Sequence, residues 1–306
     1  MSWSCEAPSK HPETHDMSPL TSALLRKQRR PRVSLVAALG QCLWMSVGLA
    51  SEIEPLVVTA DRSQECAAAL SQGRQALNVG GLPASFSLLN WNVEKAKHPD
   101  LISAFSDFAK RSDLIFLQEA VPLRKTETVI EQSLYKAFVR GYIQNETDTG
   151  VLTLARVPHL VHCHLLATEP WLRTPKATSV TLYPLANSDQ TLLTVNLHAI
   201  NFSFGVTAYA AQLNAVAGLI SAHRGPVIFG GDLNTWSQRR QRTLEALASD
   251  LNLTAVPFSP DYRTTRFNRA LDHLYVRGLT WRTTQTLPVT TSDHNPLIAT
   301  LQRDGA

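Results

Sequence analysis

Residues 226–234 read PVIFGGDLN, a short apolar run followed directly by small and polar residues. The run from Val227 to Phe229 has the β-branched and apolar composition of a buried strand. Two glycines follow it, and then Asp232 and Asn234. A strand that ends in polar residues delivers them at fixed geometry to the edge of a sheet, where ligands usually bind. This segment therefore predicts a buried strand with functional side chains at its carboxyl end.

Five other segments place a polar side chain at the start or the end of an apolar strand. Taken one at a time, such residues are usually turn formers or helix caps. Together they supply oxygen and imidazole donors without a cluster of cysteine ligands, a set that suits Mg²⁺ or a similar hard cation. The side chains are Asn92 and Glu94, Glu119, His198, Asp272, and Asp293 with His294.

The chain has 306 residues, of which 44% are hydrophobic and 18% charged. It can therefore bury a large core and is neither disordered nor a coiled coil. From residue 85 to 302, short apolar runs alternate with segments of helical periodicity, which predicts one α/β domain. Helices are expected over Pro99–Arg111, Gly205–Arg224 and Arg240–Leu251. Residues 51–84 mix alanine, serine, glutamine and glycine, which predicts a linker or a short accessory helix.

The positive charge of the chain is concentrated in its first 32 residues. The net charge is +4 and the isoelectric point about 8.9. Residues 1–32 hold six basic and three acidic side chains, which leaves 23 basic and 22 acidic side chains in residues 33–306. Because the body of the chain is nearly neutral, the isoelectric point does not by itself indicate nucleic-acid binding.

An uncharged apolar run, residues 33–50, follows this basic segment directly and ends in small residues. That order is typical of a secretory signal, so we expect residues 1–50 to be a basic leader with a signal peptide. Roughly 18 apolar residues is also the lower limit for a membrane span, so an uncleaved anchor is the alternative. We expect export, to the periplasm or to an inner-membrane anchor if the source is bacterial. A cytoplasmic chain with a buried N-terminal helix is the other interpretation.

Cys66 and Cys163 are the only cysteines outside this leader, so a chain that has lost it can form only this disulfide. Cys163 lies between His162 and His164, and strand alternation would place both histidines on one face. A metal site there would lack a CxxC motif or a second cysteine and histidine cluster nearby. A structural role for this strand is therefore the favoured interpretation.

Six segments of the chain resemble, in order, the signature blocks of the endonuclease/exonuclease/phosphatase superfamily, to which DNase I belongs. They are LLNWNVEK, LIFLQEA, VNLHA, GGDLNTWS, LDHLYV and TSDHNPL. Within this superfamily, stretches such as NLHAINFSFGV and GGDLNTWSQRR are most similar to the bacterial branch called YafD-like. The resemblance covers residues 85–302. It implies a DNase I-like α/β fold, a four-layer sandwich of two packed mixed β-sheets flanked by helices.

The resemblance also implies a role for each matching side chain. Glu119, with Asn92 and Asp293, matches ligands of Mg²⁺, for which Mn²⁺ is the alternative. His294 matches a histidine that pairs with the residue matching Asp272 and that activates water or stabilises the transition state. The remaining matches are Asp232 and Asn234, which orient the nucleophile and hold a phosphate oxygen, and His198, a phosphate ligand or general acid.

Phosphodiester cleavage needs an oriented water, a base with a pKa near neutrality and neutralisation of the charge on the phosphate. A histidine held by a carboxylate provides the base, and a bound divalent cation stabilises the phosphate charge. No serine or cysteine motif competes for a nucleophilic role. We therefore expect a Mg²⁺-dependent phosphodiester hydrolase, and we favour a nuclease over a phosphatase or phosphodiesterase acting on a lipid headgroup or small phosphoester. A catalytically silent binding protein on the same fold is the remaining alternative.

Two departures from the family pattern and a local charge pattern bear on the substrate. Lys95 stands where many nucleases have glycine, and Asp148-Thr149 replaces a tyrosine common in abasic-site enzymes, which disfavours the repair of abasic DNA. Two arginine triplets flank catalytic segments, and at the rim of the site they would attract a phosphate-rich substrate such as nucleic acid. They are Arg239, Arg240 and Arg242, and Arg263, Arg266 and Arg269. Nothing in the sequence predicts a protein partner, and the apolar run of the leader is a candidate for membrane association.

Overall fold

The computed structural model describes residues 59–60, 62–73, 80–121 and 134–305 of the chain. The described residues all belong to one compact unit within Glu52–Ala306. The leader predicted over residues 1–50 therefore lies outside them. Among the described residues, no helix combines the length and the apolar character that a membrane crossing requires.

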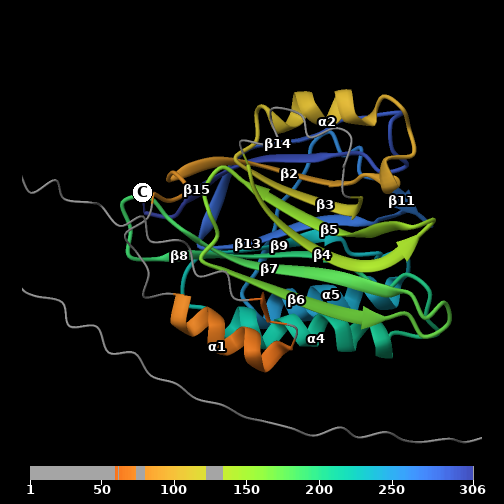
Figure 1. The fold of residues 1–306 in the computed structure, drawn as a ribbon, viewed down its shortest axis with the longest axis horizontal. Helices are drawn as coiled ribbons and strands as arrows, with labels where there is room; N and C mark the ends of the chain where they lie inside the picture. The colour runs from red at the N-terminus through yellow and green to blue at the C-terminus, as the bar shows by residue number, and fades with distance from the viewer. Residues whose placement is uncertain (1–58, 61, 74–79, 122–133, 306) are drawn as a thin grey trace, which may run out of the picture. The chain divides into compact units, whose positions relative to one another are not determined.

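Two mixed β-sheets form the centre of the domain (Figure 1). Within the described residues, the first sheet has seven strands in the order β1-β6-β7-β8-β9-β13-β10. Its strands are β1 (Thr59–Ala60), β6 (Val161–Thr168), β7 (Pro175–Pro184), β8 (Thr191–His198), β9 (Val227–Asp232), β10 (Thr254–Ala255) and β13 (Asp272–Arg277). β8 and β9 run parallel, and β13 runs antiparallel to β9.

The second sheet has six strands among the described residues, in the order β14-β15-β2-β3-β5-β4. Its strands are β2 (Ser85–Asn92), β3 (Leu114–Ala120), β4 (Tyr135–Gln144), β5 (Thr147–Ala155), β14 (Leu279–Thr286) and β15 (Leu297–Arg303). Two short strands, β11 (Thr265–Arg266) and β12 (Arg269–Ala270), pair as a separate hairpin.

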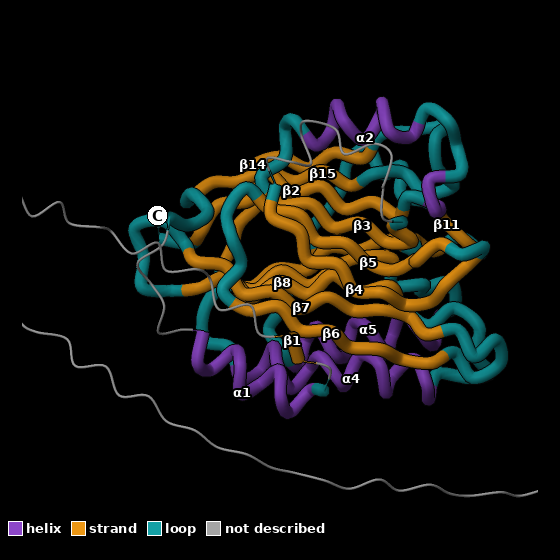
Figure 2. Tube along the Cα trace, in the orientation of Figure 1, coloured by secondary structure: helices purple, strands orange, loops and turns teal. Residues whose placement is uncertain are grey.

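Helices cover the outer faces of both sheets (Figure 2). The second sheet is covered by α2 (Leu101–Ala109), and a short 3₁₀ helix, η1 (Glu94–Ala96), follows β2. The first sheet is covered by α1 (Ser63–Gly73), α4 (Thr207–Ala222) and α5 (Gln238–Asp250). The three helices predicted from the sequence are observed as α2, α4 and α5, with ends shifted by no more than about two residues, the usual uncertainty of helix ends.

Buried apolar side chains fill three layers between these elements. Phe116 of β3 and Leu274 of β13 pack between the two sheets. Val195 and Leu213 pack between the first sheet and its helices, and Phe105 of α2 packs against the second sheet. The predicted four-layer sandwich of two mixed sheets flanked by helices is therefore confirmed.

The prediction that residues 51–84 form a linker is wrong for the part that the structure describes. β1 pairs in parallel with β6, and α1 packs on the first sheet. Cys66 of α1 forms a disulfide with Cys163 of β6, with a Cα–Cα distance of 5.6 Å. The accessory helix anticipated as the alternative is therefore an integral part of the domain.

The strand that contains His162 and His164 is β6, in the interior of the first sheet. His162 Nδ1 lies 3.2 Å from His164 Nε2, and His162 Nε2 lies 3.1 Å from Ser179 Oγ. Burial lowers the pKa of His162 to about 3. These contacts are consistent with the structural role favoured for this strand.

Candidate active site

Strand register places Asp232 at the centre of the candidate site. Asp232 is the last residue of β9, which lies between β8 and β13. It pairs with His198, the last residue of β8, on one side and with Asp272, the first residue of β13, on the other. Neighbouring residues on adjacent strands share one edge of the sheet. Three side chains that are widely separated in sequence are thus brought together by pairing alone.

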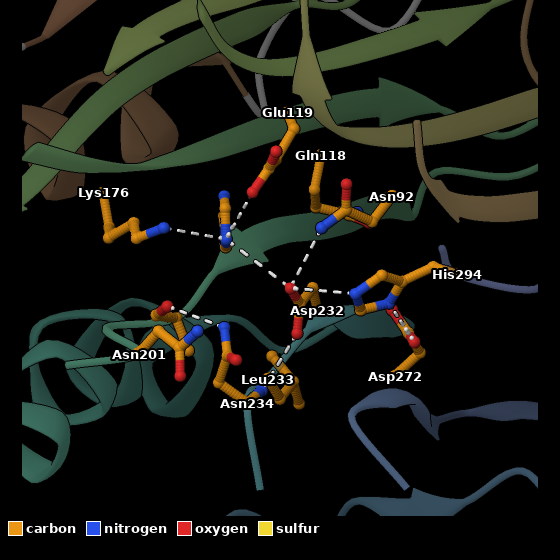
Figure 3. A network of polar contacts seen from close by, with 12 residues as sticks. Asn92, Gln118, Glu119, Lys176, Asn201, Asp232, Leu233, Asn234, Asp272 and His294 are labelled. Atoms are coloured by element: carbon orange, nitrogen blue, oxygen red, sulfur yellow. Dashed lines mark hydrogen bonds and ion pairs between the residues drawn. The ribbon is translucent and has the colours of Figure 1, made fainter. Parts of the chain in front are cut away.

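His294 and Asp272 form a buried pair beside this centre (Figure 3). His294 Nδ1 lies 2.7 Å from Asp272 Oδ2, and His294 Nε2 lies 4.0 Å from Asp232 Oδ2. Burial by itself would lower the pKa of His294, but the carboxylates of Asp272 and Asp232 outweigh it and raise the pKa to about 10. The imidazole is therefore positively charged at neutral pH and lies between two carboxylates.

The loop that carries His294 is fixed by hydrogen bonds to the end of β2. The Trp91 indole donates to the carbonyl of His294 at 2.8 Å. Ser292 Oγ donates to the carbonyl of Asn92 at 2.7 Å and accepts from the backbone N–H of His294 at 3.2 Å. These contacts join the β14–β15 loop to β2 and hold the imidazole in place.

Asp232 accepts hydrogen bonds on both of its carboxylate oxygens. Asn92 Nδ2 donates to Oδ2 at 3.1 Å, and the backbone N–H of Asn234 donates to Oδ1 at 3.1 Å. Burial raises the pKa of Asp232. One carboxylate oxygen each of Asp232 and Asp272 and one ring nitrogen of His294 lie within 4.8 Å of one another. A proton on His294 balances part of the negative charge of this group.

Glu119 lies in a β-bulge of β3, where the pairing with β5 shifts register between Leu117 and Ala120. Its φ of +50° is in the left-handed region, and a bulge re-aims the side chain it carries. The Glu119 carboxylate forms an ion pair with the Lys95 ammonium group. Burial would lower the pKa of Lys95, but the hydrogen bond and the charge of Glu119 outweigh it and raise that pKa.

Asn92, Glu119 and Asp293 are the oxygen donors that the family resemblance assigns to a divalent cation. Burial raises the pKa of Asp293, whose carboxylate faces the negative charges of Glu94 and Glu119. Two carboxylates with the amide oxygen of Asn92 form a hard, oxygen-rich set, which suits Mg²⁺ or Mn²⁺. Glu119 already binds a cation in the form of the Lys95 ammonium group. These residues therefore fit a divalent cation, with Lys95 as its competitor for Glu119.

His198 contacts Lys176, which the sequence did not single out and which lies next to Glu169. Lys176 Nζ lies 3.1 Å from His198 Nε2 and 3.9 Å from Glu169 Oε1. His198 Nε2 also lies 3.5 Å from Asp232 Oδ2 and 3.9 Å from Glu119 Oε1. Burial, and then the charge of Lys176, lower the pKa of His198 well below its usual value. Neutral His198 accepts from Lys176 through Nε2, so this nitrogen carries no proton, which disfavours the general-acid role.

A polar network between the two sheets lies beside the site. Gln118 Nε2 donates to Asn90 Oδ1 at 2.9 Å and to Asn196 Oδ1 at 2.8 Å. Asn196 Nδ2 donates in turn to Thr153 Oγ1 at 3.2 Å. All four side chains are buried. The network joins β2 and β3 of the second sheet to β8 of the first, and within the described residues Asn90 Nδ2 and Gln118 Oε1 are left without a hydrogen-bond partner.

Residues 89–294 match the family model described as the endonuclease/exonuclease/phosphatase family. The chain belongs to this family. A UPF0294 protein of Erwinia tasmaniensis is 37% identical over 212 residues, which cover 69% of this chain and 79% of the relative. The resemblance predicted from the sequence is therefore confirmed.

Solved structures of this family share the fold. The human Nocturnin catalytic domain with bound sulfate anion has a TM-score of 0.55 at 16% identity, over 76% of this chain and 99% of that chain. D. rerio TDP2 complexed with single strand DNA product has a TM-score of 0.50 at 16% identity, over 71% of this chain and 99% of that chain. At these identities the likeness shows the family fold alone.

Arg240, predicted at the substrate rim, is fully buried, and this prediction is wrong. Its guanidinium group donates to the carbonyls of Ile200, Asn201 and Asn234 and to Ser203 Oγ. It also lies over the rings of two aromatic residues, at 4.7 and 4.6 Å from their centroids. The rings belong to Tyr209 and Trp236. Arg240 therefore holds the loop after β8 to the loop after β9, and its one unpaired donor, Nε, is buried and not accessible to a substrate.

The other predicted rim arginines differ in their freedom. Arg263 is largely buried, pairs with Asp261 at 2.7 Å and lies 5.6 Å over the Phe258 ring, so it is committed to the fold. Arg239 and Arg242 are exposed on α5, Arg266 is exposed on β11, and Arg269 is half-buried on β12. The four arginines outside these structural contacts are Arg239, Arg242, Arg266 and Arg269. They remain candidates for the rim.

Proposed function

We propose that this member of the endonuclease/exonuclease/phosphatase family hydrolyses phosphodiesters with an activated water. The observation that carries the proposal is the position of Asp232, which strand pairing places between His198 and Asp272. Around it, His294 pairs with Asp272 at 2.7 Å and lies 4.0 Å from Asp232. A silent binding protein has no need of a buried acid, base and imidazolium in one group.

The roles of the side chains follow from their charges. Asp232, whose pKa is raised by burial, orients the attacking water and accepts its proton as the water oxygen bonds to phosphorus. The ester bond from phosphorus to the leaving oxygen breaks, and that oxygen takes a proton from solvent. His294, held as an imidazolium by Asp272, stabilises the negative charge that grows on the phosphate oxygens. In Figure 3, Lys176 and Asn234 lie on the side of Asp232 that faces away from His294. The Lys176 ammonium group and the Asn234 amide bind the phosphate from that side. The protein thus surrounds the phosphorus with donors and keeps one carboxylate for the water.

Mg²⁺ or Mn²⁺ held by Glu119, Asn92 and Asp293 would supply Lewis-acid stabilisation of the phosphate. Lys95 forms an ion pair with Glu119. A divalent cation held by Glu119 would therefore compete with the Lys95 ammonium group for this carboxylate.

Nucleic acid and a lipid headgroup are the two substrate classes carried forward from the sequence. The single strand DNA product in the TDP2 complex and the exposed arginines Arg239, Arg242 and Arg266 support a nuclease. The structural contacts of Arg240 and Arg263 remove part of that support. Four exposed apolar side chains beside the site favour a phosphodiester at a membrane: Trp171, Leu172, Phe202 and Phe204.

One panel of substrates tests this proposal. The purified full chain is assayed on plasmid DNA, RNA, phosphatidylinositol phosphates, sphingomyelin and a chromogenic phosphodiester, with Mg²⁺, with Mn²⁺ and with EDTA. We expect metal-dependent turnover that His294→Ala abolishes. Turnover that survives EDTA or this substitution would contradict the mechanism, and no turnover of any substrate would favour a silent binding protein.

We also propose that the chain is exported, to the periplasm or to an inner-membrane anchor if the source is bacterial. The disulfide between Cys66 and Cys163 supports this, because such bonds persist in oxidising compartments and are rare in the cytosol. Cell fractionation and sequencing of the mature N-terminus provide the test. An intact cytosolic chain with both cysteines reduced would contradict the proposal.

A further inference from the structure

Two loops beside the site expose large apolar side chains, which we call the apolar rim: Trp171, Leu172, Phe202 and Phe204. Their exposed fractions are 58%, 60%, 54% and 77%. Trp171 and Leu172 lie between β6 and β7, and the two phenylalanines lie between β8 and α4. The rings of Trp171 and Phe204 are in contact, with centroids 4.0 Å apart. A group of exposed apolar side chains on a folded domain marks an interaction surface.

The apolar rim is held in place by buried polar groups. Glu169, which is 1% exposed, accepts from the backbone N–H groups of Asn201 at 2.8 Å and Phe202 at 3.2 Å. Arg240 donates to the carbonyl of Asn201 at 2.8 Å and to Ser203 Oγ at 2.9 Å. The two loops are therefore fixed to each other and to the domain. Their apolar side chains are presented to solvent by a built scaffold.

The same polar groups connect the rim to the catalytic side chains. Glu169 Oε1 lies 3.9 Å from Lys176 Nζ, which lies 3.1 Å from His198 Nε2. Asn201 accepts from the indole of Trp236 at 3.0 Å and is drawn close to Asn234 in Figure 3. A surface that contacts the apolar rim would therefore lie beside Lys176 and His198.

The chemistry of the rim selects a lipid bilayer over a nucleic acid. Leu172 has no ring to stack on a base, and a nucleic acid would require several cations along its backbone. In residues 169–174 and 199–206, Arg173 is the single basic residue and buried Glu169 the single acidic one. Tryptophan, phenylalanine and leucine with one cation are the side chains found at the boundary of lipid headgroups and acyl chains. The same chain carries the uncharged apolar run of residues 33–50.

We propose that the apolar rim inserts into the headgroup region of a phospholipid bilayer and places the active site over lipid phosphodiesters. The insertion stands on the geometry of the two loops. Only the identity of the substrate as a lipid rests on the proposed function. Insertion buries the Trp171 indole, the Leu172 side chain and the Phe204 ring, which are the most exposed groups of the apolar rim.

Quenching of tryptophan fluorescence by brominated lipid tests this insertion. The full chain is mixed with brominated phosphatidylcholine vesicles, with and without phosphatidylglycerol. The chain has six tryptophans, so the difference between the wild type and Trp171→Phe isolates the quenching of Trp171. We expect strong quenching of Trp171, and an equilibrium constant for its insertion that falls about tenfold in Phe204→Ser because one buried ring is lost.

Matched variants separate insertion from folding and from catalysis. Tyr135→Ser removes a ring that is 48% exposed on β4, in the other sheet, and leaves the quenching of Trp171 unchanged. His294→Ala should abolish turnover and should also leave the quenching of Trp171 unchanged. Thermal unfolding of Phe204→Ser is the control for folding: an unfolding transition like that of the wild type is expected, so that weaker quenching reports weaker insertion.

Equal quenching of the wild type and Trp171→Phe would overturn the proposal, because residues 33–50 alone would then hold the vesicle. A response of Trp171 to single-stranded DNA but not to vesicles would overturn it as well, in favour of base stacking. Loss of turnover on every substrate with Trp171 still quenched would contradict the proposed function and leave the insertion standing.

Discussion

Replacing Arg240 by alanine tests whether this residue is an internal brace or part of a substrate rim. The guanidinium group bonds to three carbonyls and one hydroxyl and lies between two aromatic rings. Each buried acceptor left without a donor costs about 1–3 kcal/mol. Because the loops relax and water enters, we expect the whole set to cost about 3–5 kcal/mol rather than the sum.

Urea unfolding followed by circular dichroism measures this cost. In a domain of this size, about 3–5 kcal/mol corresponds to a fall in Tm of roughly 10 °C. Arg239→Ala is the matched control, because Arg239 is exposed on the preceding position of the same helix, and it should change stability by no more than about 0.5 kcal/mol. Equal stability of the two variants would refute the role of Arg240 as an internal brace. A raised KM in Arg240→Ala without loss of stability would show instead that Arg240 contacts the substrate.

Three further predictions concern the buried polar groups and the disulfide. Lys176→Met removes the charge that helps to keep His198 neutral, so the pKa of His198 should rise toward its usual value. NMR titration measures this pKa, and an unchanged titration would contradict the contact between Lys176 and His198. Cys66→Ser combined with Cys163→Ser opens a loop of 97 residues and should lower the free energy of unfolding, measured in urea, by about 2–4 kcal/mol. Equal stability of the oxidised wild type and the variant would show that the disulfide does not stabilise the domain. In the unfolded chain His162 recovers its ordinary pKa of 6.5, against about 3 when folded, so stability present at neutral pH is lost as the pH falls below 6.5. That loss is about 2 kcal/mol between pH 7 and pH 5, and His162→Gln should remove it; identical pH profiles of the two proteins would contradict the burial of a neutral imidazole.

The central strands of both sheets could be predicted from the sequence because they are buried on both faces. Their apolar runs are continuous, as in PVIFGGD and LIFLQEA. The strands β4 and β14 have no such run because they lie at the two edges of the second sheet. Their sequences, YKAFVRGYIQ and LTWRTTQT, alternate exposed polar residues with apolar ones. An edge strand therefore carries a weaker apolar signal than a central one.

The site was predictable where its residues stand at strand ends, and less so elsewhere. Lys176, which is 22 residues from His198 in sequence, shows its role only when β7 and β8 pair. One signal was present, since a lone lysine in an otherwise buried strand requires a partner. Arg240 also carried a signal. It precedes Leu244, Leu247 and Ala248 on the buried face of α5, at helical spacing.

The central claim is that His294 and Asp272 act as one unit beside Asp232. A double-mutant cycle on the best substrate of the panel tests it most directly, with kcat measured for His294→Ala, Asp272→Asn and both together. Each single substitution should lower kcat by about 10²–10⁴-fold, and the double variant should be no slower than the worse single variant. A double variant slowed by the product of the two effects, or single variants as active as the wild type, would contradict the claim.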